Sequence, residues 1–271
     1  MDRDIARSKK EKLIEHLRGL DSVLVAFSGG VDSTFLLALA HQVLGERTVA
    51  ATATSSTYPF HEREEAIKFA RDRGIQHIIF PSDETSAPEF LANSPDRCYY
   101  CKGSLCQELI KMATARGIKY VAHGANMDDL RDYRPGLKAA KEMGIIAPLI
   151  DAQLNKEEIR FLSKEMGLPT WDKPGMACLA SRIPYGEVIT EEKLKMVEEA
   201  EAFLSMNGFR QYRVRHHGTV ARIEVEDSDI SRFTEPGLRL KIVEKFRQIG
   251  FHHIAVDLEG YISGSMNRGL M

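Results

Sequence analysis

The residues best suited to chemistry in this chain form a short loop, Ser28-Gly29-Gly30-Val31-Asp32-Ser33. The apolar run Val23–Phe27 precedes the loop and is typical of a buried parallel strand. The two glycines let the backbone turn tightly and approach a ligand closely, and Asp32 and Ser33 begin a helix. A strand, a glycine turn and a helix start together direct backbone N–H groups at one anion. The loop therefore predicts a phosphate-binding site.

The loop differs from the G-x-x-x-x-G-K-[ST] loop of many ATPases, whose lysine reaches the outer phosphates. No lysine occurs between Asp21 and Glu65. The pattern S-G-G-x-D-S resembles instead the loop of the PP-loop ATP pyrophosphatases. That resemblance implies that ATP binds here, that pyrophosphate leaves whole and that AMP stays on an acceptor. The alternative interpretation is a structural glycine turn before an ordinary helix.

A second candidate for chemistry is the stretch Met176–Gly186, which places Cys178, Ser181 and Arg182 within five residues. A thiolate is favoured beside a cationic group, and Arg182 follows Cys178 by four positions. A lone cysteine beside leucine and alanine is more often a small buried hydrophobic residue. The residues alone leave both interpretations open.

Short apolar runs alternate with amphipathic segments up to about residue 170, which predicts an α/β fold with a doubly wound parallel sheet. The expected strands are Val23–Phe27, Thr48–Thr54, His77–Phe80, Tyr120–His123 and a short piece at Ile145–Leu149. The expected helices are Asp4–Leu17, Ser33–Val43, His61–Arg73, Gly103–Arg116 and Asn155–Met166. Ligands of such sheets bind beyond the carboxyl ends of the strands.

That edge of the sheet would gather the loop with two further segments, Thr54–Ser56 and Gly124–Asp129. Thr54 is therefore a candidate ATP-binding residue. Asp129 falls just past a strand end, where a carboxylate can hold Mg²⁺ through its waters. An ordinary surface acid is the alternative for Asp129.

A turn-rich stretch at residues 167–175 separates the two expected domains, an ATP-binding domain at 1–170 and a small α+β domain at 171–271. The second domain is predicted to contain an antiparallel sheet and to bind substrate or form an oligomer interface. Its expected elements are the helices Thr190–Met206 and Leu238–Ile249, a hairpin of Gln211–Arg215 with Thr219–Glu226, and a last strand at His253–Asp257.

Composition narrows the classes of function. The 271 residues carry a formal net charge of −2, which gives no support for a nucleic-acid surface. The N-terminus lacks the apolar core of a secretory signal, and no apolar run approaches the ~20 residues of a membrane span. We therefore expect a cytoplasmic protein without a membrane partner. In that compartment the four cysteines are expected to be thiols or metal ligands rather than disulfides.

Motifs along nearly the whole chain resemble the LarE family, ATP-dependent sulfur transferases of nickel-pincer nucleotide synthesis. The matching stretches are Ser28–Ser33, Asp96–Lys102, His123–Asp129, Asp132–Gly136, Trp171–Pro174, Ala177–Gly186, Tyr212–Gly218 and Ala221–Glu224. The resemblance implies that ATP adenylates a carboxylate of pyridinium-3,5-biscarboxylic acid mononucleotide. It also implies that the thiolate of Cys178 attacks the acyl-adenylate and gives up its sulfur, which leaves dehydroalanine. The family further implies a homo-oligomer, a hexamer.

The substrate phosphate needs cationic donors, and arginine offers a planar, fixed set. Arg213 and Arg215 alternate along one expected strand and so share a face, and with Arg182 they are our phosphate candidates. An exposed charged strand face is the alternative. Ser181 and Glu224 complete the expected substrate site, with Glu224 orienting an arginine or binding a metal. The alternative for Glu224 is an acid that points outward from a strand and has no such role.

Cys98 and Cys101 form a C-x-x-C, a weak signal shared by zinc sites, redox pairs and iron–sulfur ligands. Some members of the resembled family are thought to carry a [4Fe–4S] cluster, for which Cys98, Cys101 and Cys178 would be the ligands here. Sacrificial donation by Cys178 is the preferred hypothesis. The remaining alternatives are another PP-loop enzyme, an amidating synthetase or a tRNA thiolase, and a non-catalytic ATP sensor.

Overall fold

The computed structural model describes residues 1–131, 133–262 and 264–266. Asp132, which belongs to one of the motifs of the family resemblance, lies outside the described residues. Contacts divide the chain into two compact units, Met1–Glu84 with Cys98–Met176 and Thr85–Arg97 with Ala177–Met271. Residues 85–97 therefore belong to the second unit although they precede the expected boundary at residue 170.

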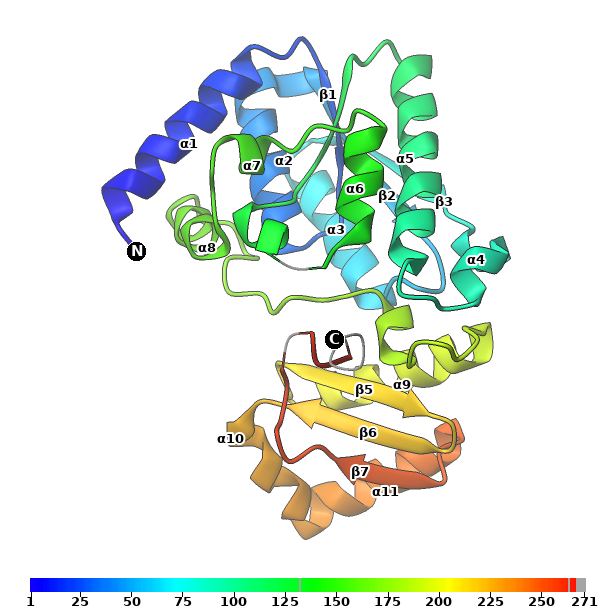
Figure 1. The fold of residues 1–271 in the computed structure, drawn as a ribbon. Coiled ribbons are helices and arrows are strands. Elements are labelled where there is room, and N and C mark those ends of the chain that lie inside the picture. Colours follow the sequence, from blue (N-terminus) through cyan, green and yellow to red (C-terminus); the bar gives the residue numbers. More distant parts are fainter. Residues whose placement is uncertain (132, 263, 267–271) are drawn as a thin grey trace. The chain divides into compact units, whose positions relative to one another are not determined.

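The first unit is built on a four-stranded parallel sheet in the order β3-β2-β1-β4 (Figure 1). Its strands are β1 (Val23–Ala26), β2 (Thr48–Thr54), β3 (Gln76–Pro81) and β4 (Tyr120–His123). Its helices are α1 (Arg3–Arg18), α2 (Val31–Leu44), α3 (Phe60–Asp72), α5 (Arg97–Ala115), α6 (Pro135–Glu142), α7 (Pro148–Asp151) and α8 (Lys156–Glu165). The predicted α/β fold class is confirmed.

Apolar side chains project from both faces of this sheet, and helices pack against each face. Val23 and Val25 of β1 join one core while Leu24 between them joins another, as the period of two in a strand requires. The first core receives side chains from α1, α2, α3 and α8, such as Leu17, Phe35, Phe69 and Ile159. The second receives Leu109 of α5 and Ala140 of α6. Because helices pack on both faces of the sheet, β1 is held in the middle of the unit. The loop at residues 28–33 follows β1 directly.

The second unit contains a three-stranded sheet in the order β5-β6-β7, with β5 (Tyr212–His217), β6 (Val220–Val225) and β7 (His253–Val256). Its helices are α4 (Pro88–Leu91), α9 (Glu191–Met206), α10 (Asp227–Ile230) and α11 (Pro236–Ile249). The strands β5 and β6 form the expected antiparallel pair, whereas β7 pairs with β6 in parallel. The parallel pairing follows from the helical crossover through α11, which returns the chain in the same direction.

One face of this second sheet is apolar and packs against α9 and α11. The side chains that fill this core include Leu204 of α9, Phe246 of α11, and Val214 and Ile223 of the hairpin. Because side chains alternate along a strand, the residues between them, Arg213 and Arg215 on β5 and Arg222 and Glu224 on β6, share the opposite face.

Two sequence predictions about elements are wrong. The expected strand Ile145–Leu149 is only an isolated bridge between Ala122 and Ile146. Pro148 has no N–H for a sheet but suits a first helical turn, and it begins α7. The expected helix Gly103–Arg116 begins six residues earlier, at Arg97. A glycine inside a helix costs only about 1 kcal/mol relative to alanine, so Gly103 does not set the helix start.

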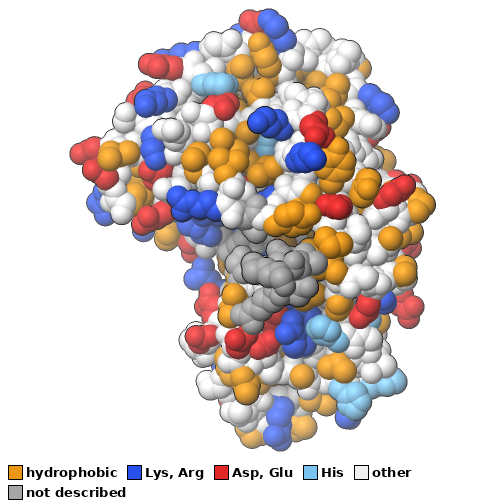
Figure 2. Space-filling view, viewed as in Figure 1, with side chains coloured by type: hydrophobic (Ala, Val, Ile, Leu, Met, Phe, Trp, Pro, Cys, Tyr) orange, Lys and Arg blue, Asp and Glu red, His pale blue; other side chains and the backbone are white. Residues whose placement is uncertain are grey.

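Acidic and basic side chains are interspersed over the face shown in Figure 2, in keeping with the small net charge. Within the described ranges, no helix has both the length and the apolar composition needed to cross a bilayer.

Candidate functional site

The loop between β1 and α2 leads into a helix start whose first backbone N–H groups can face a ligand. Gly29 has φ +65, a conformation that favours glycine, and a Cβ there would lie 3.2 Å from the Cβ of Ala66 in α3. Gly30 is the N-cap of α2 and provides no side-chain hydrogen bond to the helix. The first N–H groups of a helix have no intrahelical acceptor, so the start of α2 can bind an anion, as the sequence predicts.

Ser28 and Ser33 close the loop on itself. The Ser33 hydroxyl accepts from the Ser28 N–H at 3.3 Å, donates to the Gly30 carbonyl at 3.2 Å and lies 3.1 Å from the Ser28 hydroxyl. Ser33 is buried. These contacts tie the two ends of the loop together.

The segment after β4 packs directly on the start of α2. A Cβ at Gly124 would lie only 2.8 Å from the Ser33 nitrogen and 3.0 Å from its Cα. Only glycine permits so close an approach of two backbones. Gly124 thus brings Asn126 and Asp129 beside the loop, at the edge of the sheet where the sequence places them. Thr54 ends β2 at the same edge, where its hydroxyl donates to the Phe80 carbonyl at 3.2 Å.

Asp32 is paired with Lys156, the first residue of α8, which sequence reasoning missed. The Lys156 ammonium donates to Asp32 Oδ2, and the Lys156 N–H donates to Asp128 Oδ2 at 2.8 Å. Asp129 is held in turn by the Asn126 N–H at 2.9 Å and by Arg134 at 2.9 Å. Lys156 supplies a cation that the loop itself lacks, from 124 positions further along the chain.

The carboxylates at this edge suit a hard cation. Burial raises the pKa of Asp32, the Lys156 charge opposes the rise and the neighbouring Asp129 charge adds to it. Asp32 Oδ1 is buried and has no hydrogen-bond partner among the described residues. An unsatisfied carboxylate oxygen beside a second carboxylate is a donor set of the kind that Mg²⁺ prefers. The free oxygen of Asp32 therefore fits a magnesium ion, whereas the role of Asp129 as a magnesium ligand stays a prediction.

A second cation that the sequence analysis missed is Lys173. Its ammonium donates to Glu62 at 2.6 Å, to Glu65 at 2.6 Å and to the Gly29 carbonyl at 3.3 Å. Arg160 of α8 fixes this segment by donating to the carbonyls of Trp171 and Lys173 at 2.9 and 2.7 Å. The sequence signal for Lys156 is only the lack of a lysine in the loop, whereas Lys173 also lies in the stretch Trp171–Pro174 of the family resemblance.

In the second unit, Cys178 is exposed while the arginine that follows it by four positions is entirely buried. The Arg182 guanidinium makes a paired contact with Glu201, at 2.8 Å from Nε and 2.8 Å from Nη2. Its Nη1 donates to the carbonyls of Ala177 and Cys178, at 2.5 and 3.0 Å, and to the Ser181 hydroxyl at 3.0 Å. Arg182 thus fixes the backbone that carries the Cys178 thiol. Its role in binding substrate stays a prediction.

Arg213 and Arg215 are also buried, on the polar face of the second sheet. Arg215 donates to Glu224 at 2.6 Å and to the Ser181 carbonyl at 3.1 Å, so it ties β5 to the Cys178 segment. Arg213 lies with its guanidinium 5.0 Å from the centre of the Tyr261 ring. Glu224 contacts Arg215, which is one of the two roles expected for it.

These side chains form an arginine cluster, defined here as Arg182, Arg213 and Arg215 with Glu201 and Glu224. Burial acts to lower the pKa of Arg182, but the contact with Glu201 outweighs it and raises the pKa overall. Burial, and next the charge of Arg182, lower the pKa of Arg213. The cluster carries three guanidinium groups against two carboxylates, so its field attracts an anion.

Similarity to known proteins identifies the family. A protein-family model described as NAD synthase matches residues 7–98. An uncharacterized protein of Synechocystis is 45% identical over 263 residues, which cover 97% of this chain and 98% of that protein. The pyridinium-3,5-bisthiocarboxylic acid mononucleotide synthase of Lactiplantibacillus plantarum is 36% identical over 261 residues, 96% of this chain and 94% of that enzyme. This chain belongs to the LarE family.

The LarE chain is therefore a PP-loop enzyme that uses ATP. One of the subunits of the glutamine-hydrolyzing GMP synthase of Pyrococcus furiosus is 31% identical over 215 residues, 72% of this chain and 66% of that protein.

The other cysteines of the LarE chain differ in their surroundings. Cys98 is exposed and Cys101 half-buried at the start of α5, whereas Cys106 lies in the second core, where burial raises the pKa of its thiol. Within the described parts of the chain, no group of three His, Cys, Asp or Glu side chains is arranged as a metal site. The iron–sulfur alternative stays a prediction.

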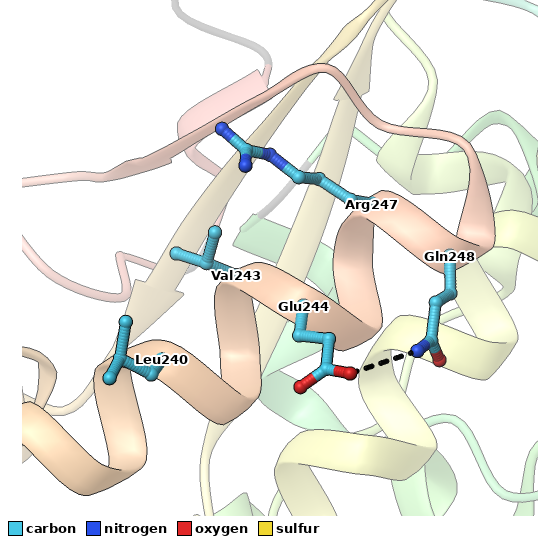
Figure 3. A pocket seen from close by; sticks show the side chains of 5 residues that line it. All are labelled: Leu240, Val243, Glu244, Arg247 and Gln248. Carbon is cyan, nitrogen blue, oxygen red and sulfur yellow. Dashed lines mark hydrogen bonds between the residues drawn. The ribbon is translucent and has the colours of Figure 1, made fainter.

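A surface pocket on α11 lies apart from all of the predicted site residues in sequence (Figure 3). It is lined by Leu240, Val243, Glu244, Arg247 and Gln248. Gln248 donates to Glu244 at 3.4 Å across one helical turn. The lining offers no nucleophile and no paired carboxylates, so we do not consider it the catalytic site.

We expect Gly124→Ala to displace the start of α2, because the added Cβ would meet backbone rather than a flexible side chain. Overpacking of this kind costs about 1–3 kcal/mol, which thermal unfolding would detect together with weaker ATP binding. Gly103→Ala is the matched control, since a Cβ there meets nothing within 4 Å and lies in a helix. Equal melting temperatures for the two variants would contradict the close approach.

We expect Glu201→Gln to destabilise the second unit strongly, because it leaves the buried Arg182 without its anion. Breaking a buried ion pair in this way costs about 3–5 kcal/mol, measured by urea unfolding. Glu199→Gln on the same helix should cost less than about 0.5 kcal/mol, because its 3.9 Å contact with Lys195 is exposed. A small loss for Glu201→Gln would mean that Arg182 finds another partner.

Proposed function

We propose that this LarE chain is an ATP-dependent sulfur transferase of nickel-pincer nucleotide synthesis. It adenylates a carboxylate of pyridinium-3,5-biscarboxylic acid mononucleotide and converts it to a thiocarboxylate with the sulfur of Cys178. The observation that carries this proposal is the whole-length similarity to an enzyme named for a bisthiocarboxylic acid product. The exposed Cys178 on a buried arginine frame and the anion-binding loop support it.

The first step joins the substrate carboxylate to AMP. A carboxylate oxygen attacks the α-phosphorus of ATP, and the bond to the β-phosphate oxygen breaks so that pyrophosphate leaves. The N–H groups at the start of α2 and the ammonium of Lys156 stabilise the negative charge of that leaving group. Asp32 and Asp129 would hold Mg²⁺, which supplies further charge neutralisation when bound.

The next steps transfer sulfur. The Cys178 thiolate attacks the acyl carbon, forms a thioester and expels AMP. Loss of the α-proton of residue 178 then drives cleavage of its Cβ–S bond. The electron pair of that bond leaves with the sulfur as a thiocarboxylate, and residue 178 becomes dehydroalanine. One protein molecule therefore donates one sulfur atom.

The residues of the arginine cluster would hold the substrate through its phosphate. Arg213 and Arg215 are the proposed ligands, with Ser181 beside them and Glu224 orienting Arg215. Arg182 shapes this site by fixing the Cys178 segment. The family resemblance implies that the chain forms a homo-oligomer, a hexamer, and this stays a prediction.

Intact-protein mass spectrometry after incubation with MgATP and the substrate tests the sulfur source. Conversion of a cysteine to dehydroalanine removes about 34 Da as H₂S, and we expect this loss at residue 178. Cys178→Ala should still release pyrophosphate but form no thiolated product, whereas Cys98→Ser should keep both product and mass loss. If the unaltered chain forms thiolated product without a change in protein mass, and Cys98→Ser forms no product, the [4Fe–4S] route would be supported instead. Full turnover by Cys178→Ala would favour an amidating or other PP-loop enzyme.

Asp32→Asn tests the ATP site. The substitution keeps the shape of the side chain but removes the charge that pairs with Lys156, so we expect pyrophosphate release to fall by about a hundredfold or more. Asp72→Asn, at an exposed position of α3, is the control and should release pyrophosphate at the normal rate. Normal release by Asp32→Asn, with the fold intact by circular dichroism, would contradict the assignment of this site.

A further inference from the structure

Two carbonyl oxygens of the phosphate loop are bound by side chains that the proposed chemistry does not use. The Tyr58 hydroxyl, from the segment between β2 and α3, donates to the Ser28 carbonyl at 2.6 Å. The Lys173 ammonium donates to the carbonyl of the next residue, Gly29, at 3.3 Å. Two consecutive peptide groups of the loop are therefore held from outside.

The direction of a carbonyl fixes the direction of the N–H in the same peptide. A trans peptide is planar, so its C=O and N–H point in opposite directions, and the described backbone contains no cis peptide bond. The Ser28 carbonyl shares its peptide with the Gly29 N–H, and the Gly29 carbonyl shares its peptide with the Gly30 N–H. Both N–H groups thus point away from Tyr58 and Lys173.

Glycine makes such a restraint necessary. Gly29 has φ +65, and glycine populates positive and negative φ about equally well, so these peptides can turn over at little cost. A turned peptide would present a carbonyl oxygen to a bound phosphate in place of an N–H donor. That arrangement repels the anion that the loop is built to bind.

We propose that Tyr58 and Lys173 are positioning residues that hold the Gly29 and Gly30 N–H groups toward the pyrophosphate of ATP. The inference rests on the proposed function, because it assigns a role within the same ATP site. Neither residue touches the reacting atoms. Each acts through the carbonyl that it binds.

Tyr58 is itself held in place by a buried carboxylate, Glu84. The hydroxyls of Ser55 and Thr57 both donate to Glu84 Oε1 at 2.5 Å, and the Ser82 hydroxyl donates to Oε2 at 2.6 Å. The Tyr58 N–H closes a turn on the Ser55 carbonyl at 3.2 Å. A buried carboxylate needs such donors, so Glu84 fixes the turn that presents the Tyr58 hydroxyl.

The electrostatic surroundings keep both donors in their donating form. Burial, then Glu62 and Glu65, raise the pKa of Tyr58, so its hydroxyl stays protonated and donates at any physiological pH. The contacts with Glu62 and Glu65 outweigh the effect of burial and raise the pKa of Lys173. Because these two carboxylates already offset its charge, Lys173 acts on the loop chiefly as a directed donor.

The test compares Tyr58→Phe with the unaltered full-length chain by isothermal titration calorimetry. The probes are inorganic pyrophosphate with Mg²⁺, and AMP. Loss of one hydrogen bond that orients the loop should weaken pyrophosphate binding about five- to tenfold. AMP affinity should change less than about twofold, because the restraint acts on the two N–H groups toward pyrophosphate. Lys173→Arg, which keeps a donor toward Gly29, should bind pyrophosphate more tightly than Lys173→Met.

Tyr120→Phe serves as the control, since no hydrogen bond of the Tyr120 hydroxyl is found among the residues that the structure describes. Unchanged pyrophosphate affinity in Tyr58→Phe would overturn this inference but leave the proposed ATP site standing. Equal losses for pyrophosphate and AMP with a lower melting temperature would also overturn it, because Tyr58 would then be merely structural. Failure of the unaltered chain to bind pyrophosphate would overturn the proposed ATP site itself, and this inference with it.

Discussion

The first unit depends on one electrostatic constraint: a loop that binds concentrated negative charge contains no cation of its own. Lys156 brings a cation to the loop, and Lys173 donates a hydrogen bond to it. Carboxylates hold both lysines there because an unpaired, partly buried lysine is unfavourable. Asp32 holds Lys156, while Glu62 and Glu65 hold Lys173. Positive and negative side chains therefore alternate around the start of α2, and each lysine is held by the carboxylates beside it. Asp32 Oδ1 has no hydrogen-bond partner among the described residues, so a metal cation could bind there.

In the second unit, the buried cations that carboxylates must hold are arginines. Arg182 is wholly buried, and every nitrogen of its guanidinium donates, either to Glu201 or to the three acceptors beside Cys178. Arg215 donates to Glu224 and to the Ser181 carbonyl. These bonds fix the backbone while the Cys178 thiol stays exposed. A reactive side chain on a rigid frame loses little entropy on reaching its reaction geometry, which suits the sulfur-donor role proposed for Cys178.

Backbone geometry carries the rest of the ATP site. Gly124 lets the segment after β4 approach α2 more closely than any side chain would permit, and Gly29 gives the loop its positive φ. The freedom that glycine brings must then be removed, and the hydrogen bonds of Tyr58 and Lys173 to two consecutive carbonyls do so. The loop thus combines a backbone that only glycine permits with side chains from distant segments that restrain it.

The sequence by itself determined the features that depend on neighbouring residues. The apolar run of β1, the glycine turn and the start of α2 are local, so the sequence predicted a strand, a helix and an anion site between them. The alternation of such segments predicted the parallel sheet, and motifs along nearly the whole chain indicated the family. Other features depend on contacts between distant positions. The partner of Asp32 lies 124 residues away, the burial of Arg182 depends on Glu201 in another helix, and the parallel pairing of β7 depends on the crossover of α11. Only the tertiary structure decided these, because charge pairing and burial are set by which segments pack together and not by the order of residues within one segment.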